Sequence, residues 1–204
     1  MSKNPIIVFE GIEGSGKSLH INNVSNYLKK INRKFIRIRE PGGSNNSEKI
    51  RKLILDNKSS FNENTDLLLY MSARSENISL IKKNFKKKII LIDRFVDSTI
   101  AYQHYGLGVD IKIINLINNF LLKNIKVTFT FLNLVNSKNM IERLKKRKKL
   151  NRYDKFSIAF YNKVQKGFLN ISKRRNNKYL KVNSNLEINS NKKMIINKVK
   201  ELIT

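Results

Sequence analysis

Eight residues near the start of the chain constrain its fold most strongly. Residues 11–18 read Gly-Ile-Glu-Gly-Ser-Gly-Lys-Ser and fit the pattern G-x-x-x-x-G-K-[ST]. The apolar segment 6–10 precedes them, and an amphipathic helical pattern follows. The apolar face of that pattern consists of Ile21, Val24, Leu28 and Ile31. A strand, a glycine-rich loop and a helix in this order predict a site for ATP or GTP.

The residue types of this loop suit phosphate chemistry. Glycines allow successive backbone N–H groups to turn toward phosphate oxygens, and the helix N-terminus adds a partial positive charge. We expect Lys17 to reach the outer phosphates and the Ser18 hydroxyl to ligate Mg²⁺. A glycine-rich turn without a ligand is the alternative. The predicted ATP-binding residues are Gly11, Ile12, Glu13, Gly14, Ser15, Gly16, Lys17 and Ser18.

Strand-like and helix-like segments alternate along the chain. The alternation predicts an α/β fold with a five-stranded parallel sheet flanked by helices, in one P-loop domain spanning residues 1–204. The predicted strands are 6–10, 35–39, 88–93, 126–133 and 179–183. Besides the helix after the loop, the predicted helices are 47–55, 64–83, 97–122, 137–147, 155–174 and 190–203.

Acidic residues are scarce, and several follow predicted strands. The chain has 15 Asp and Glu residues, and Asp93 ends the apolar run 89–92. Ligands of parallel sheets bind at the carboxyl ends of strands, so we expect Asp93 to contact Mg²⁺ there, directly or through water. A helix cap or a partner for a lysine is the alternative. The acids near the ends of the first three strands are Glu10, Glu13, Glu40, Asp93 and Asp97.

The net charge of +27 invites a nucleic-acid interpretation. However, 31 Lys, 29 Asn and 27 Ile share A/T-rich codons, which suggests a genomic bias rather than a binding surface. Nucleic acid therefore stays a minority hypothesis, limited to non-specific binding. The chain has no Cys and no run of 18 apolar residues, and its first residues lead straight into a strand. We expect no membrane span, no signal peptide and a cytoplasmic location.

Further motifs follow the loop in a recognisable order. They are Phe9–Ser18, Arg39–Ser44, Asp93–Gln103, the basic stretch 143–152 and, more weakly, Leu69–Arg74. In this order and spacing, the chain resembles the thymidylate kinase family, whose members phosphorylate dTMP with ATP. The likeness covers nearly the whole chain and implies a homodimer.

The resemblance implies an acceptor site for dTMP. Tyr70 stands where the family stacks an aromatic ring on thymine, although the same position fits a helix core residue. Pro41 stands where the family has a cis proline, and Glu13 where an acid holds the sugar 3′-hydroxyl. Arginine suits phosphate because its fork meets two oxygens at once. The implied dTMP-binding residues are Glu13, Pro41, Arg51, Tyr70, Arg74, Arg94, Thr99, Tyr102 and Gln103.

The resemblance also implies a short basic lid at about 143–153. The variable positions of the phosphate loop contain no arginine, and such family members supply one from the lid. Arg143, Arg147 and Arg152 are candidates, of which Arg147 and Arg152 are preferred; a solvated helix end is the alternative. The predicted catalytic residues are Glu13, Lys17, Arg94, Arg147 and Arg152, and the predicted metal ligands are Ser18 and Asp93.

The expected activity is transfer of the ATP γ-phosphoryl group to dTMP, giving dTDP and ADP for dTTP synthesis, with Mg²⁺. The first alternative is another nucleotide or deoxynucleoside kinase. A nucleotide-regulated switch and an ATP-dependent nucleic-acid-binding protein are further alternatives, the second motivated by the charge.

Overall fold

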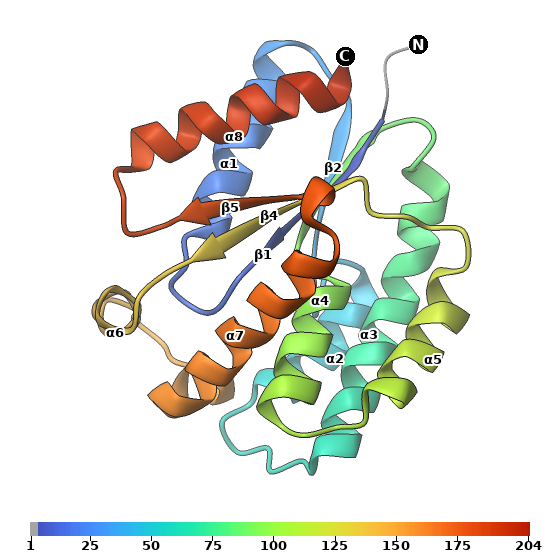
Figure 1. Ribbon diagram of the computed structural model, residues 1–204. Coiled ribbons are helices and arrows are strands. Elements are labelled where there is room, and N and C mark those ends of the chain that lie inside the picture. Colours follow the sequence, from blue (N-terminus) through green and yellow to red (C-terminus); the bar gives the residue numbers. More distant parts are fainter. Residues whose placement is uncertain (1–3) are drawn as a thin grey trace.

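A five-stranded parallel sheet, which confirms the predicted fold class, forms the centre of the protein (Figure 1). The computed structural model describes residues 4–204. Met1–Lys3, where the sequence predicts no signal peptide, lie outside the described residues. The sheet has the order β2-β3-β1-β4-β5. Its strands are β1 (Ile6–Glu10), β2 (Phe35–Arg39), β3 (Ile89–Asp93), β4 (Phe129–Leu134) and β5 (Tyr179–Asn183).

Helices cover both faces of the sheet, as Figure 1 shows. The α-helices are α1 (Lys17–Lys30), α2 (Asn45–Leu55), α3 (Glu63–Asn84), α4 (Val96–Thr99), α5 (Ile111–Leu122), α6 (Ser137–Lys145), α7 (Ile158–Arg174) and α8 (Ile188–Ile203). A π-helix, η1 (Ile100–Gly106), and two 3₁₀-helices, η2 (Arg152–Lys155) and η3 (Asn176–Lys178), complete the chain. No helix of the described residues is long and apolar enough to cross a membrane.

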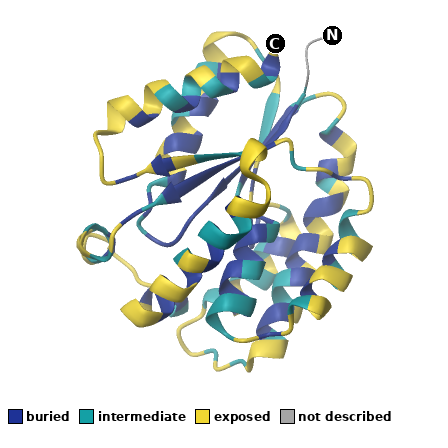
Figure 2. Ribbon diagram, viewed as in Figure 1, coloured by how far each residue is buried: buried dark blue, intermediate teal, exposed yellow. Residues whose placement is uncertain are grey.

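The central strand β1 is buried along its whole length (Figure 2). Its side chains alternate between the two faces of the sheet, as the pleat requires. Ile7 and Phe9 pack in a core with α1 and α8, whereas Ile6 and Val8 pack in a core with α3. Burial on both faces explains why the strand reads as a continuous apolar run rather than an alternating one.

Most element boundaries agree with the sequence pattern, but the predicted helix over 97–122 is wrong. The structure divides it into α4, the π-helix η1 and α5. Gly108 adopts a left-handed backbone with φ +85°, and the Asp110 side chain accepts a hydrogen bond from the Lys112 N–H at 2.8 Å, which starts α5. At Gly106 a Cβ atom would lie 2.7 Å from the Phe160 ring. The break therefore follows from local caps and a close packing contact.

Smaller differences have local causes as well. Ile31, predicted on the apolar face of the first helix, lies just past the end of α1 and is exposed. The helix predicted over 155–174 starts at Ile158, because Ser157 caps it and η2 precedes it. The strand predicted over 126–133 starts only at Phe129.

Glu10, at the end of β1, is a buried carboxylate in the core behind the strand ends. Its Oε1 accepts hydrogen bonds from the N–H groups of Phe95 (2.8 Å) and Ser98 (3.2 Å), and its Oε2 accepts one from the Ser98 hydroxyl at 2.5 Å. Burial, reinforced by the nearby Asp97, raises the pKa of Glu10 to about 7. The carboxyl thus holds the start of α4 against β1.

We predict that Glu10→Gln weakens the pH dependence of folding stability. The folded-state pKa of Glu10 lies above its ordinary value, so its contribution is full below about pH 4.5 and is lost as the pH rises through 7. The wild type should therefore lose stability between pH 5 and 7.5, and the variant should lose less. Urea unfolding at both pH values measures the difference. An equal loss in the two proteins would contradict the prediction.

Candidate active site

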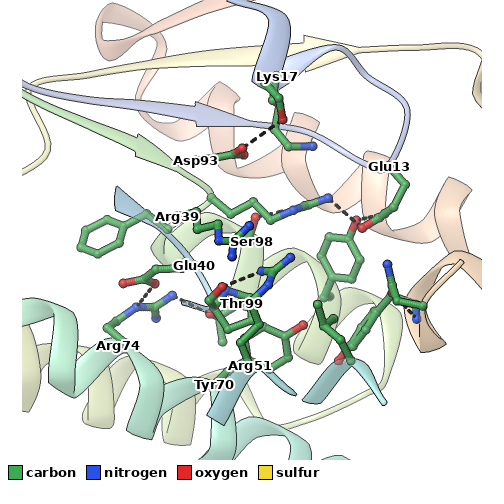
Figure 3. Close-up of a pocket in the computed structure, with 18 of the residues that line it drawn as sticks. Glu13, Lys17, Arg39, Glu40, Arg51, Tyr70, Arg74, Asp93, Ser98 and Thr99 are labelled. Atoms are coloured by element: carbon green, nitrogen blue, oxygen red, sulfur yellow. Dashed lines mark hydrogen bonds and ion pairs between the residues drawn. The ribbon is translucent and has the colours of Figure 1, made fainter. Parts of the chain in front are cut away.

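A cleft with a cavity volume of about 220 Å³ opens at the carboxyl ends of β1, β2 and β3. β1 and β4 are neighbours, and the chain leaves β1 toward β2 on one side of the sheet but leaves β4 toward β5 on the other. Such a point, where the direction of the connections reverses, is where α/β proteins bind ligands. The lining is rich in charged and aromatic residues (Figure 3). It comprises Glu13, Lys17, Ser18, Arg39, Glu40, Pro41, Arg51, Leu55, Tyr70, Arg74, Asp93, Arg94, Phe95, Ser98, Thr99, Tyr102, Gln103, Arg147, Asn151 and Tyr153.

The predicted phosphate loop connects β1 to α1 at one side of the cleft. Gly11 has φ +138°, and a Cβ atom there would lie 2.3 Å from the Asn133 carbonyl oxygen of β4, so the position requires glycine. Gly16 is the N-cap of α1, with φ +83°. The Ser15 hydroxyl donates to the Ile12 carbonyl at 2.7 Å and braces the turn. The first turn of α1 therefore presents its free N–H groups beside the cleft.

Lys17 is buried within this loop. Its Nζ donates hydrogen bonds to the carbonyl oxygens of Gly11 (2.9 Å) and Ile12 (2.8 Å). Burial, and secondly the guanidinium of Arg94, lowers the pKa of Lys17 to about 7. An anionic group in the cleft would favour the charged form of this amine.

Ser18 and Asp93 bring two oxygen atoms together at the ends of α1 and β3. The Ser18 hydroxyl donates to Asp93 Oδ2 at 3.2 Å. Hydroxyl and carboxylate oxygens suit Mg²⁺, which commonly takes one or two protein ligands and completes its shell with phosphates and water. No group of three or more acidic or histidine side chains in residues 4–204 could hold a metal. The pair therefore fits a nucleotide-bound Mg²⁺ rather than a metal held by protein alone.

Arg94 links the phosphate loop to the π-helix. Its Nη1 donates to the Gly11 carbonyl at 2.8 Å, and its Nη2 donates to Glu13 Oε1 at 2.7 Å. The other oxygen of Glu13 accepts a hydrogen bond from the Tyr102 hydroxyl, and the guanidinium lies over the Tyr102 ring at 5.1 Å. Although burial opposes its charge, Glu13 and Tyr102 raise the pKa of Arg94 above its ordinary value. A fixed cation thus lies beside the loop.

Arg74 is completely buried at the wall of the cleft. Its Nε donates to Glu40 Oε2 at 2.9 Å, its Nη1 to Asn118 Oδ1 at 2.7 Å and its Nη2 to Thr99 Oγ1 at 2.9 Å. Burial raises the pKa of Glu40, and Arg74 counteracts it. Thr99, one of the predicted dTMP-binding residues, therefore has Arg74 as its partner.

Other predicted dTMP-binding residues face the phosphate loop across the cleft. Figure 3 shows Lys17 and Asp93 at one side and Arg51, Tyr70 and Arg74 at the other. Arg51 Nη1 donates to the Pro41 carbonyl at 2.6 Å, and the peptide bond before Pro41 is cis, as the resemblance implied.

Aromatic side chains form the wall beside Tyr70. Its ring packs edge-on against Tyr153 at 5.9 Å, and Tyr102 also packs against Tyr153 at 5.9 Å. Gln103 is buried, and its Nε2 donates to the Tyr153 hydroxyl at 3.4 Å. Tyr102 and Gln103, two of the predicted dTMP-binding residues, thus come together with Tyr70 around Tyr153.

The three arginines of the predicted lid have different positions. Arg147 lines the cleft and forms an ion pair with Asp154. Arg143 donates to the Gly14 carbonyl at 2.8 Å and the Ser184 carbonyl at 2.7 Å, so it braces the back of the phosphate loop. Arg152 is outside the set of described residues that line the cleft, and it pairs with Asp66 of α3.

Two of the five acids near the strand ends do not face the cleft. Glu10 and Asp97 line a second cavity behind β1, and Asp97 accepts a hydrogen bond from the Tyr179 hydroxyl. Conversely, Asn151 and Tyr153 line the cleft although neither is among the predicted site residues. Tyr153 directly follows the basic stretch 143–152. That position could have indicated a place in the site, but the stretch is conspicuous for its charged residues only.

Comparisons with known proteins agree with this geometry. The family model described as "Thymidylate kinase" matches residues 9–195. Proteins named thymidylate kinase from Thermosipho africanus and a Sulfurihydrogenibium species are 39% and 35% identical; the alignments cover 85% and 96% of this chain and 87% and 96% of those proteins. A crystal structure of thymidylate kinase from Ehrlichia chaffeensis matches with a TM-score of 0.78 at 29% identity, covering 97% of this chain and 99% of that one. The chain therefore belongs to the thymidylate kinase family.

Proposed function

We propose that this protein transfers the γ-phosphoryl group of ATP to dTMP, giving dTDP and ADP, in the cytoplasm and for dTTP synthesis. The observation that carries the proposal is that a phosphate loop and an arginine-lined pocket with aromatic walls share one cleft, with Arg94 fixed between them. Family membership supports dTMP as the acceptor. The alternative functions have no comparable feature in their favour.

On the donor side, the loop of residues 11–18 holds the phosphates of ATP. Its backbone N–H groups and the N-terminus of α1 bind phosphate oxygens, and Lys17 neutralises the outer phosphates. Ser18 and Asp93 would hold Mg²⁺, which supplies charge neutralisation at the β- and γ-phosphates when bound. Arg143 keeps the loop in place through the Gly14 carbonyl.

On the acceptor side, the pocket holds dTMP by its base, sugar and phosphate. Tyr70 stacks on the base, while Thr99 and Gln103 read the base and sugar. Glu13, oriented by Arg94 and Tyr102, accepts a hydrogen bond from the sugar hydroxyl. The phosphate-binding and pocket-shaping residues are Arg51, Arg74, Arg94 and Pro41.

Catalysis then consists of positioning and charge neutralisation. The attacking oxygen of dTMP is already anionic, so no general base is required. Lys17 and Arg94 both donate to the Gly11 carbonyl, so in the proposed reaction they supply two neighbouring cations to the donor and acceptor phosphates. Arg147, on the lid, adds a third cation from the open side of the cleft.

The family resemblance further implies a homodimer, and α5 offers a surface for it. Ile113, Leu116 and Phe120 are exposed by 47%, 71% and 72%, and their spacing puts them on one helical face. Large apolar side chains gathered on one face usually mark a contact surface. α5 packs beside α3, where Leu68 is also exposed.

We predict that purified protein with ATP and Mg²⁺ forms ADP with dTMP, and far more slowly with dAMP, dCMP or thymidine. Lys17→Ala and Arg94→Ala should each lower kcat/KM by about 10²–10³, because each removes a charge that stabilises the transferring group. Lys198→Ala, at a partly exposed lysine of α8 remote from the cleft lining, is the matched control and should keep wild-type rates. A coupled assay of ADP formation measures all of these. No ADP with dTMP would refute the proposed function.

Nucleotide binding should also take up a proton above neutral pH. The pKa of Lys17 is about 7, so the amine is mostly neutral at pH 8, and bound phosphate should restore its charge. Calorimetry of a non-hydrolysable ATP analogue at pH 8, in buffers of different ionisation enthalpy, should give an uptake approaching about one proton. Lys17→Met should abolish that uptake. An unchanged uptake in the variant would assign the proton to another group.

The proposed homodimer predicts that substitutions on the exposed face of α5 change the molecular mass of the protein in solution. Replacing Leu116 and Phe120 by lysine should convert a dimer into a monomer of 23.9 kDa, because two apolar side chains that the proposed interface covers become charged. Size-exclusion chromatography with light scattering measures the mass. Leu186→Lys, at another leucine that is 60% exposed, should leave the dimer intact. A monomeric wild type would contradict the proposed assembly.

A further inference from the structure

Arg152 and Asp66 form an ion pair between the lid and α3 that lies beside the cleft rather than in it. We propose that this pair, together with the Tyr153 hydroxyl, is a latch that holds residues 147–155 against the α2–α3 corner. In this role Arg152 is a positioning residue that acts through Asp66, and Arg147 is the lid arginine that meets substrate. The proposal deepens the proposed function and rests on it for its kinetic consequences only.

Asp66 is the fixed half of the latch. It lies in the first turn of α3 and is 2% exposed. Its Oδ1 accepts a hydrogen bond from Arg152 Nη2, and its Oδ2 accepts one from the Tyr153 hydroxyl. A buried carboxylate is costly unless it is paired and hydrogen-bonded, and here both side-chain partners come from the lid. The buried carboxylate of Asp66 therefore has its side-chain partners only while residues 152 and 153 are docked against it.

Arg152 is engaged by a carbonyl oxygen and by two aromatic rings as well as by Asp66. Its Nε donates to the carbonyl oxygen of Ile54, in the last turn of α2, at 3.1 Å. The guanidinium lies over the Phe61 ring at 5.5 Å and over the Tyr153 ring at 5.0 Å. These contacts join the lid to α2 and α3 at once. They leave Arg152 poorly placed to bind a phosphate oxygen.

The latch positions side chains that do face the cleft. Tyr153 lines the cleft, where it packs edge-on against Tyr70 and receives the Gln103 hydrogen bond. Asn151 and Asp154 form a capping box around η2, and Asp154 also binds Arg147. Docking η2 on Asp66 therefore fixes the turn that carries Arg147.

A second contact supports the same docking. The Asn57 side chain, in the loop between α2 and α3, donates to the Leu150 carbonyl at 2.9 Å. The lid thus contacts the α2–α3 corner at two points, the Leu150 carbonyl and the Arg152 side chain. By contrast, no acid of the described residues pairs with the exposed lysines 145, 146, 148 and 149.

A double-mutant cycle tests the latch. Asp66→Asn and Arg152→Gln should each lower kcat for dTMP phosphorylation by about 10–100-fold, because Arg147 loses its fixed position. The double variant should be no worse than the poorer single variant, since both changes break one unit. Arg152→Lys should recover part of the rate, because a lysine can still pair with Asp66. Lys198→Gln, which breaks the exposed Lys198–Glu201 pair, is the control for loss of an ion pair.

Two results would overturn the latch. Near-normal kcat in Asp66→Asn with a large loss in Arg152→Gln would make Arg152 a direct phosphate ligand. Multiplying losses in the double variant would mean that the two residues act independently.

Hydrogen exchange gives a readout that needs no turnover. In Asp66→Asn, amides of residues 147–155 should exchange faster, while those of β1 and β4 keep wild-type protection. Faster exchange throughout the protein, or none in 147–155, would refute the latch. If Asp66→Asn does not fold, Tyr153→Phe removes the hydrogen bond to Asp66 together with the long one from Gln103, keeps the ion pair and is measured in the same way. A wild type inactive on dTMP would refute the proposed function without affecting this test.

Discussion

Pairing of β1 with β3 and β4 is the constraint on which the active site depends. In this register Phe9 lies opposite both Asp93 and Phe131, so the phosphate loop leaves β1 where β3 ends. The Arg94 N–H donates to the Phe9 carbonyl at 3.0 Å, which extends the pairing past Asp93. A shift of one residue would turn Ile7 and Phe9 to the other core and separate Ser18 from Asp93. Burial of an apolar strand thus sets the geometry of a polar site.

Several acids in and beside the cleft hold arginines in place. Glu13 orients Arg94, Glu40 orients Arg74, and Asp154 binds Arg147. An arginine used for phosphate must keep one orientation, and a buried carboxylate supplies that restraint while the guanidinium keeps other N–H donors free. Removing either the acid or the arginine of such a pair leaves the other as an unpaired charge, so each loss should disturb the site beyond the contact that was removed. The cleft is therefore a set of coupled ion pairs.

The strands of the sheet, the phosphate loop and most of the residues that line the cleft could be predicted from the sequence. Parallel strands buried on both faces give continuous apolar runs, and a loop motif is contiguous in the chain. The break before α5 escaped prediction because Ile111 and Ile114 continue the helical spacing after Gly108. The Arg152–Asp66 pair escaped because its members are 86 positions apart, and no local pattern connects them.

Burial separates the lysines from the residues of the site. Among residues 4–204, Lys17 is the one buried lysine, and the others are exposed or, at Lys88 and Lys198, partly exposed. If the charge had been selected for a particular ligand, lysines should be ordered by partners or concentrated in a groove. They lie instead on many elements, so a genomic bias toward A/T-rich codons accounts for most of the net charge of +27. What this surface can still add is a diffuse positive field that draws polyanionic nucleotides toward the cleft, where the paired arginines and Lys17 provide the selection.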